Sequence, residues 1–163
     1  MAKRILVPLD EAVRAEGMIE ELATLSRGSG AVARLLHVAP TPDNIVDEDG
    51  RVRAYADQEA ARLEAAALDY LRRIATTFGS VTVECAVRFG DPAEQILEDA
   101  DAWDADLIAM ATHGRSGFSR MFLGSVAERV LRHSGVPILL VRAEPGAKAG
   151  NPGRKNREKA AQT

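Results

Sequence analysis

The sequence has a single cysteine, few aromatic residues and no long apolar run, and each shortage excludes a class of protein. Cys85 has no second thiol with which to form an intrachain disulfide or a cysteine-rich metal site, so we expect a buried packing thiol. Aromatic residues make up 4% of the chain, which leaves little platform for stacking nucleic-acid bases. No apolar stretch approaches the ~18 residues that span a bilayer. The first apolar run ends at Asp10, too early for a signal sequence, so we expect a cytoplasmic protein with no membrane segment.

The charge is unevenly distributed along the chain. The formal net charge is −3, but residues 143–163 carry five basic and two acidic side chains, which makes this segment +3 and leaves −6 for residues 1–142. An acidic body lacks the basic footprint of a nucleic-acid-binding protein, so we expect no nucleic-acid partner. Residues 144–163 show no periodicity and few large apolar residues. We therefore predict one domain over residues 1–143 and a disordered basic tail over residues 144–163.

Short β-rich runs alternate with helical patterns, the order typical of a parallel sheet covered by helices. Two of the runs are almost continuously apolar, as in strands that are buried on both faces. The segment Thr41–Arg53 contains Pro, Asn, Gly and several acidic residues and indicates an exposed flexible connection. The strands we predict are Arg4–Leu9, Val32–Val38, Val81–Val87, Leu107–Ala111 and Val136–Val141.

Spacing and capping residues predict the helices between these strands. Asp91 is a helix N-cap, followed by Pro92 at the first helical position and by Glu94, which completes a capping box. Ser125 and Glu128 form a second capping box at the start of the last helix. Apolar residues recur at helical spacing in two earlier helices, namely Met18, Leu22 and Leu25 in the first, and Leu63, Ala67, Leu71, Ile74 and Phe78 in the second.

The segment from Met110 to Ser125 joins a predicted strand to a predicted helix. In open α/β sheets ligands bind at this edge, where helix N-termini offer unpaired N–H groups and glycines let a phosphate approach the backbone. Gly114 and Gly124 would bracket a triphosphate, Gly117 would ease the turn between them, and the Ser125 hydroxyl would donate to a phosphate oxygen. We also expect Gly124 to need backbone angles that a β-branched residue resists.

Better-known phosphate motifs are absent from the sequence, and the glycine loop has a plainer interpretation. There is no Gly-Lys-Ser/Thr of a Walker A loop, and no Gly-x-Gly-x-x-Gly follows the first strand. From the residues alone, it is equally consistent that the three glycines are turn residues and that Ser125 only caps its helix.

Several segments of the chain are specific in combination. They are Arg4-Ile-Leu-Val-Pro-Leu-Asp10, Leu36-His-Val38, Phe89-Gly-Asp-Pro-Ala-Glu94, and His113-Gly114, nine residues, Gly124-Ser125-Val-Ala-Glu-Arg-Val and Val136-Pro-Ile-Leu-Leu-Val141. Through them, residues 3–142 as a whole resemble the universal stress protein family. This resemblance implies an open five-stranded parallel sheet in the order 3-2-1-4-5 with helices on both faces, an adenine nucleotide alpha-hydrolase-like α/β fold. It also implies ATP binding in members that keep the glycines.

This chain departs from the family pattern at two places. The ATP-binding loop of the family reads Gly-x-x-Gly, nine residues, Gly-Ser/Thr, and Ala111 stands here at the first glycine. Binding should be tolerated if φ at Ala111 is negative and impaired if it is positive. Family members often follow the aspartate with Gly-Ser, whereas Glu11 and Ala12 follow Asp10 here, which removes a hydroxyl and adds a negative charge.

The resemblance also implies binding roles for residues outside the loop. Asp10 would meet the ribose hydroxyls or the adenine edge, Pro8 and Val38 would contact base and sugar, Met110 would form the pocket floor, and Val126 would give a backbone N–H to phosphate. Each role has an alternative: Pro8 ends a strand, Val38 and Met110 belong to the core, and Asp10 caps the first helix.

Charged residues near the loop complete the expected site. Arg115 and Arg120 either neutralise phosphate charge or are solvated. His113 has no evident carboxylate partner and no adjacent nucleophile, so we assign no catalytic residue, and His37 and His133 are interpreted as structural. The sequence shows no metal motif, and Mg²⁺ would arrive only with the nucleotide.

We therefore expect an ATP-binding regulatory protein in which nucleotide occupancy modulates dimerisation or partner binding in a stress response. Two alternatives stay open. One is an enzyme that hydrolyses ATP slowly, and the other is a nucleotide-free interaction module, favoured if Ala111 and Glu11 have abolished binding.

The last predicted strand suggests a homodimer. In the implied order it lies at an edge of the sheet, yet Ile138–Val141 is apolar at every position. Open edges are usually protected by charge or by covering structure. Pairing with a second copy about a two-fold axis would satisfy this edge, whereas in the alternative the tail after Arg142 folds over it.

Overall fold

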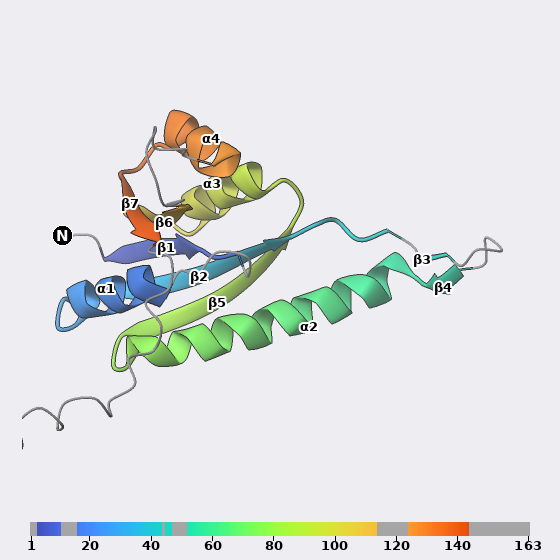
Figure 1. Ribbon diagram of the computed structural model, residues 1–163, viewed down its shortest axis with the longest axis horizontal. Coiled ribbons are helices and arrows are strands. Elements are labelled where there is room, and N and C mark those ends of the chain that lie inside the picture. Colours follow the sequence, from blue (N-terminus) through green and yellow to red (C-terminus); the bar gives the residue numbers. More distant parts are fainter. Residues whose placement is uncertain (1–2, 11–15, 44, 47–51, 114–123, 144–163) are drawn as a thin grey trace, which may run out of the picture.

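The computed structural model of the chain describes residues 3–10, 16–43, 45–46, 52–113 and 124–143. One open sheet lies between two pairs of helices, and a small hairpin stands apart from it (Figure 1). The strands are β1 (Arg4–Pro8), β2 (Val32–Ala39), β3 (Ile45–Val46), β4 (Val52–Ala54), β5 (Thr82–Phe89), β6 (Leu107–His113) and β7 (Ile138–Ala143). The helices are α1 (Glu16–Ser26), α2 (Ala56–Ala75), α3 (Pro92–Ala102) and α4 (Ser125–His133), with a 3₁₀ turn at Thr76–Phe78.

The main sheet has the strand order β5-β2-β1-β6-β7, and all its neighbouring strands are parallel. This is the order 3-2-1-4-5 of the five sheet strands, so the predicted fold is confirmed. The central strand is β1, in which Val7 pairs with Leu35 of β2 and Leu6 with Ile108 of β6. The strand order reverses between β1 and β6, and in open sheets of this kind ligands bind beyond the carboxyl ends of the strands at that point.

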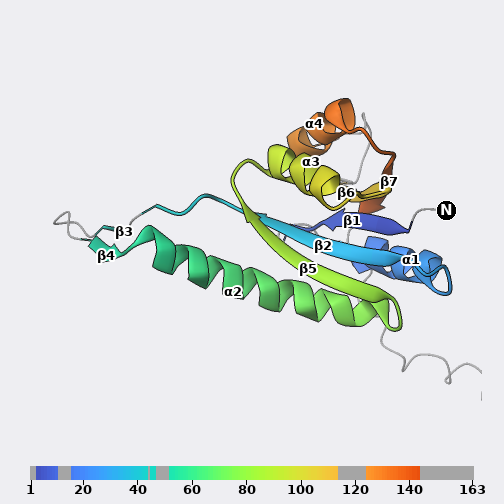
Figure 2. The ribbon, with the colours of Figure 1, turned by 180° about the vertical axis from the view of Figure 1, so that it is seen from behind.

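Each face of the sheet has its own apolar core. Helices α1 and α2 cover one face, and α3 and α4 cover the other (Figures 1 and 2). Alternate residues of a strand point to opposite faces, so Val7 packs with Met18 and Leu71 under α1 and α2, while Leu6 packs with Val130 under α4. All five side chains are almost fully buried, and burial of each contributes roughly 1.5–3 kcal/mol. Cys85 is half-buried and packs against the first of these cores.

The connection after β2 is more ordered than the sequence suggested. Within Thr41–Arg53, which we expected to be irregular, Ile45–Val46 pairs antiparallel with Val52–Ala54 as the hairpin β3–β4. The first turns of α2 run alongside the segment that joins β2 to this hairpin, past the carboxyl ends of the sheet strands (Figure 2). Composition rich in turn residues marks a hairpin as readily as a coil, which explains the wrong prediction. Residues 47–51 lie outside the described residues.

The helix starts test the capping predictions. Asp91 is the N-cap of α3, as predicted, with Pro92 in the first turn, and its side chain accepts the Glu94 N–H at 3.0 Å. The Glu94 carboxylate, which we expected to complete a capping box, lies 3.6 Å from Nη2 of Arg129 instead. The prediction for α4 is wrong: Gly124 is its N-cap, no side chain caps it, and Ser125 is the first helical residue. Glu128 instead pairs with Arg132 at 2.7 Å. The first turn of α4 therefore keeps N–H groups that no side chain of the helix satisfies.

Two further expectations concern the ends of the described structure. The last strand begins at Ile138 rather than Val136 and continues to Ala143. The tail at residues 144–163 lies outside the described residues, so the predicted boundary of the domain stays a prediction. Over the described ranges, no helix is long and apolar enough to cross a membrane.

Candidate functional site

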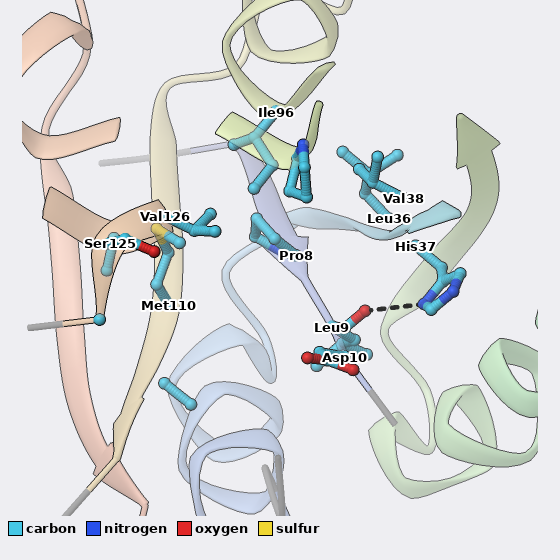
Figure 3. Close-up of a pocket in the computed structure, with 14 residues that line it drawn as sticks. Pro8, Leu9, Asp10, Leu36, His37, Val38, Ile96, Met110, Ser125 and Val126 are labelled. Carbon is cyan, nitrogen blue, oxygen red and sulfur yellow. Dashed lines mark hydrogen bonds between the residues drawn. The ribbon is translucent and has the colours of Figure 1, made fainter. Parts of the chain in front are cut away.

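A cavity of about 300 Å³ lies at the carboxyl ends of β1, β2 and β6, between the first turns of α3 and α4 (Figure 3). This is the end of the sheet at which the strand order reverses. The residues that line it are Pro8, Leu9, Asp10, Leu36, His37, Val38, Pro92, Ile96, Met110, Ala111, Gly124, Ser125, Val126 and Ala127.

The lining brings together eight residues that the sequence analysis selected from four separate segments. They are Pro8, Asp10, Val38, Met110, Ala111, Gly124, Ser125 and Val126. Gly114, Arg115 and Gly117 lie outside the described residues, as does Arg120. The ligand-binding roles of all these residues stay proposals.

Six lining residues were missed: Leu9, Leu36, His37, Pro92, Ile96 and Ala127. The sequence alone could have placed two of them at the cavity. Pro92 and Ile96 follow the N-cap Asp91, and the start of a helix after a parallel strand lies at the edge of the sheet where ligands bind. The buried Leu36 and Leu9 could not be distinguished from ordinary core residues by their type.

One side of the cavity is an apolar slot. Pro8 of β1, Val38 of β2 and Ile96 of α3 come from three different elements and face the same space (Figure 3). Ile96 and Leu36 are buried, whereas Pro8 and Val38 are half-buried. Met110, which is 6% exposed, closes the slot from β6. A flat apolar group would be desolvated there on both sides.

The first turns of α3 and α4 both reach the cavity, but they differ in the described side chains that cap them. The Asp91 carboxylate already occupies the start of α3. The N–H of Glu94 and the guanidinium of Arg129 hold the pKa of Asp91 below its ordinary value. At α4 the cavity is lined by Gly124, Ser125 and the two residues that follow, and no described side chain caps this turn. The first N–H groups of a helix and the positive end of its dipole favour an anion, so this turn is the part of the described lining that suits one.

The backbone bears on two expectations for this wall, one at Ala111 and one at Gly124, whereas Glu11 and Ala12 lie outside the described residues. Among the described non-glycine residues, only Asp104 has a positive φ, so Ala111, which lies in β6, satisfies the condition under which we expect binding to be tolerated. Gly124 has φ −39° and ψ 156°, and a β-carbon built on it meets no atom of the described residues within 4 Å. Gly124 is therefore not in the left-handed region that favours glycine, so the expectation that it needs unusual backbone angles is wrong.

The titratable groups of the lining are Asp10 and His37. Asp10 is exposed at the mouth of the cavity. The Nδ1 of His37 lies 3.0 Å from the carbonyl oxygen of Leu9 (Figure 3). A carbonyl only accepts, so Nδ1 carries the proton and the imidazole fixes the backbone between β1 and Asp10. This bond agrees with the structural role predicted for His37. In the described ranges no group of three His, Cys, Asp or Glu side chains is placed to hold a metal ion.

Comparison with known proteins gives one family. Residues 1–142 match the sequence model of the Universal stress protein family. The chain is 31% identical over 146 residues to a universal stress protein of Thermus aquaticus, a match that covers 87% of this chain and all of that protein. It is 32% identical to the universal stress protein YxiE of Bacillus subtilis, over 82% of this chain and 88% of that one. A match to MJ0531 of Methanocaldococcus jannaschii is 41% identical but spans 47% of this chain and 44% of that protein.

Solved structures share the fold. The hypothetical protein MJ0577 superposes with a TM-score of 0.69 at 26% identity, covering 88% of this chain and 98% of that chain. A universal stress protein in complex with cAMP gives a TM-score of 0.62 at 20% identity, over 87% and 98% of the two chains. A universal stress protein from Archaeoglobus fulgidus in complex with dAMP gives 0.54 at 23% identity, over 84% and 95%.

Proposed function

The chain belongs to the universal stress protein family, and from this premise we propose that it binds ATP in the cavity between α3 and α4 and acts as a nucleotide-dependent regulator in a stress response. The observation that carries the proposal is the pairing of an apolar slot with an uncapped helix N-terminus in one cavity. An adenine nucleotide has the same two parts, an aromatic base and an anionic phosphate chain. The cAMP and dAMP complexes of structural neighbours support adenine as the base.

The proposed pose follows from the chemistry of the walls. Adenine would lie in the slot formed by Pro8, Val38 and Ile96, where it loses contact with water on both faces. The Asp10 carboxylate would accept hydrogen bonds from the ribose hydroxyls, because it is exposed at the mouth beside the end of β1. The phosphates would meet the N–H groups and the hydroxyl at Gly124–Val126.

The residues of the loop beyond β6 complete the proposal. We assign Gly114 and Gly117 to close backbone approach and Arg115 to the phosphate charge, as the family pattern implies. ATP would bring its own Mg²⁺, since its phosphate oxygens are the hard ligands that this ion prefers. The methyl group of Ala111 leaves the strand geometry of β6 intact, so we propose that it lowers affinity without preventing binding.

We further propose that the regulated property is dimerisation through β7. The two edges of the sheet differ in chemistry: β5 carries the charged and exposed Glu84 and Arg88, whereas Ile138–Val141 of β7 is apolar and half-buried throughout. Charges protect an edge strand against pairing, so β7 is the edge suited to a second copy. Strand β7 pairs with β6, and the loop after β6 is the one that we propose binds the nucleotide. Nucleotide binding in the cavity would therefore alter pairing at the β7 edge.

The test is the nucleotide that the purified protein carries and rebinds. Denaturing the native protein should release an adenine nucleotide, identified by chromatography, and the nucleotide-free protein should bind ATP in calorimetry. At 100 times the dissociation constant, ATP should stabilise the fold by about 2.7 kcal/mol. A nucleotide-free protein whose melting temperature does not respond to millimolar ATP would contradict the proposal and favour an interaction module.

A further inference from the structure

Asp91 precedes the part of α3 that lines the cavity. Its neighbour Pro92 lines the cavity, and Asp91 itself caps α3 by accepting the Glu94 N–H at 3.0 Å. Glu94, one turn into the helix, adds a second exposed carboxylate on the same side. Carboxylates at the N-terminus of α3 stabilise this helix, but they repel a phosphate chain that enters the cavity. A polyanionic ligand therefore needs a compensating cation at this point.

Arg129 of α4 is that cation. Its Nη1 lies 2.8 Å from Oδ2 of Asp91, and its Nη2 lies 3.6 Å from Oε1 of Glu94. It follows Ser125 by four residues, which puts both side chains on one face of α4, and helical side chains lean toward the N-terminus. The guanidinium thus spans from the helix that we propose binds phosphate to the carboxylate that would repel it.

The second arginine of the helix provides a contrast. Arg132 pairs with Glu128 of its own helix at 2.7 Å and reaches no part of α3. Both arginines are exposed and both pair with a carboxylate, but only Arg129 joins the two helices that wall the cavity. Exposed ion pairs of this kind add little to stability, so we expect the protein to keep its fold when either arginine is replaced.

We propose that Arg129 is a charge-compensating residue of the nucleotide site: by neutralising Asp91 it lets the cavity accept a phosphate chain. This inference rests on the proposed nucleotide binding. It makes the effect of Arg129 depend on ligand charge, because the uncompensated carboxylate repels ATP more than AMP and leaves adenosine unaffected. The effect is screened by salt.

The experiment measures the dissociation constants of ATP, AMP and adenosine by calorimetry at 50 and 500 mM NaCl. The variants are Arg129→Met, which keeps the aliphatic stem, the matched control Arg132→Met, and the charge-preserving Arg129→Lys. A double variant, Asp91→Asn with Arg129→Met, removes both charges while Asn still caps the helix. In Arg129→Met we expect ATP to bind about fivefold more weakly at low salt, AMP less so, and adenosine within twofold of wild type. Arg132→Met and Arg129→Lys should bind like the wild type, and the double variant should regain ATP affinity.

Three results would overturn the inference. Arg129→Met and Arg132→Met could bind ATP equally well, ATP and adenosine could lose affinity by the same factor, or the double variant could stay as weak as the single one. The last two outcomes would mean that Arg129 acts through packing and not through charge. A wild type that binds no nucleotide would instead refute the proposed function, and the inference with it.

Discussion

Replacing Gly124 by alanine separates a glycine needed by the fold from one needed by a ligand. Gly124 has φ −39°, outside the left-handed region that favours glycine, and the added methyl group meets no atom of the described residues within 4 Å. The remaining cost is that alanine is a poorer N-cap than glycine, roughly 0.5–1 kcal/mol. In a domain of this size, that lowers the melting temperature by about 1–4 °C.

The effect on nucleotide binding should be much larger. The same methyl group would stand on the wall where we propose the phosphates approach the backbone, so we expect ATP to bind about tenfold more weakly, equivalent to a loss of ~1.4 kcal/mol. Gly124→Val should lose more, because its branched side chain covers more of the wall. Thermal melts without ligand and calorimetry with ATP measure the two effects separately.

Gly135 offers a matched control for this substitution. It also has no atom within 4 Å of an added β-carbon and no left-handed φ, but it lines a separate hollow with Asp101 and His133. Gly135→Ala should leave both stability and ATP affinity close to wild type. The reasoning would be refuted by a Gly124→Ala protein that binds ATP as tightly as wild type, or by one that loses several kcal/mol of stability without ligand.

Four further predictions follow from single groups. Asp10→Ala should weaken ATP binding and leave the melting temperature nearly unchanged, because Asp10 is exposed; an equally folded variant with wild-type affinity would exclude the ribose role. Asp99→Ala should cost about 3 kcal/mol in denaturant unfolding, because its fully buried carboxylate accepts from Arg88 at 2.7 and 3.0 Å; a cost below about 1 kcal/mol would contradict this. The pKa of Asp91 is lowered in the fold, so the ionised carboxylate stabilises the folded protein fully at neutral pH, and this stabilisation is lost as the pH falls through the lowered pKa. The difference in unfolding free energy between wild type and Asp91→Asn should therefore shrink below about pH 4. A difference that stays constant with pH would refute this prediction. Sedimentation at tens of micromolar should show a dimer that Leu140→Lys dissociates and that ATP shifts, whereas a monomeric wild type would exclude the β7 interface.

The fold could be predicted from the sequence largely because its strands and helix caps are local signals. Asp91 and Pro92 define the start of α3 by their own chemistry, and the apolar runs of β1 and β2 mark strands that are buried on both faces. The predicted start of α4 was one position too late, because Ser125 followed three residues later by Glu128 fits a capping box, whereas the N-cap is Gly124. In the structure Glu128 pairs with Arg132 instead.

The site was harder to predict than the fold, because its residues are distant in sequence and ordinary in type. The resemblance supplied Pro8, Val38 and Met110, which by composition are indistinguishable from core residues. Ile96 follows the predicted N-cap Asp91 by five residues, but whether its side chain meets a cavity depends on how α3 lies over the sheet. The pairing of Arg129 with Asp91 joins residues 38 positions apart and has no local signature.

The central claim is that an adenine nucleotide occupies this cavity with its phosphates at the start of α4. The most direct test is a titration of the ¹⁵N-labelled protein with ATP, followed by backbone amide resonances. We predict saturable shifts at Val38 and at Ser125, Val126 and Ala127, with residues around Gly135 unaffected. Amide resonances that do not move at millimolar ATP, or that move only around Gly135, would contradict the account.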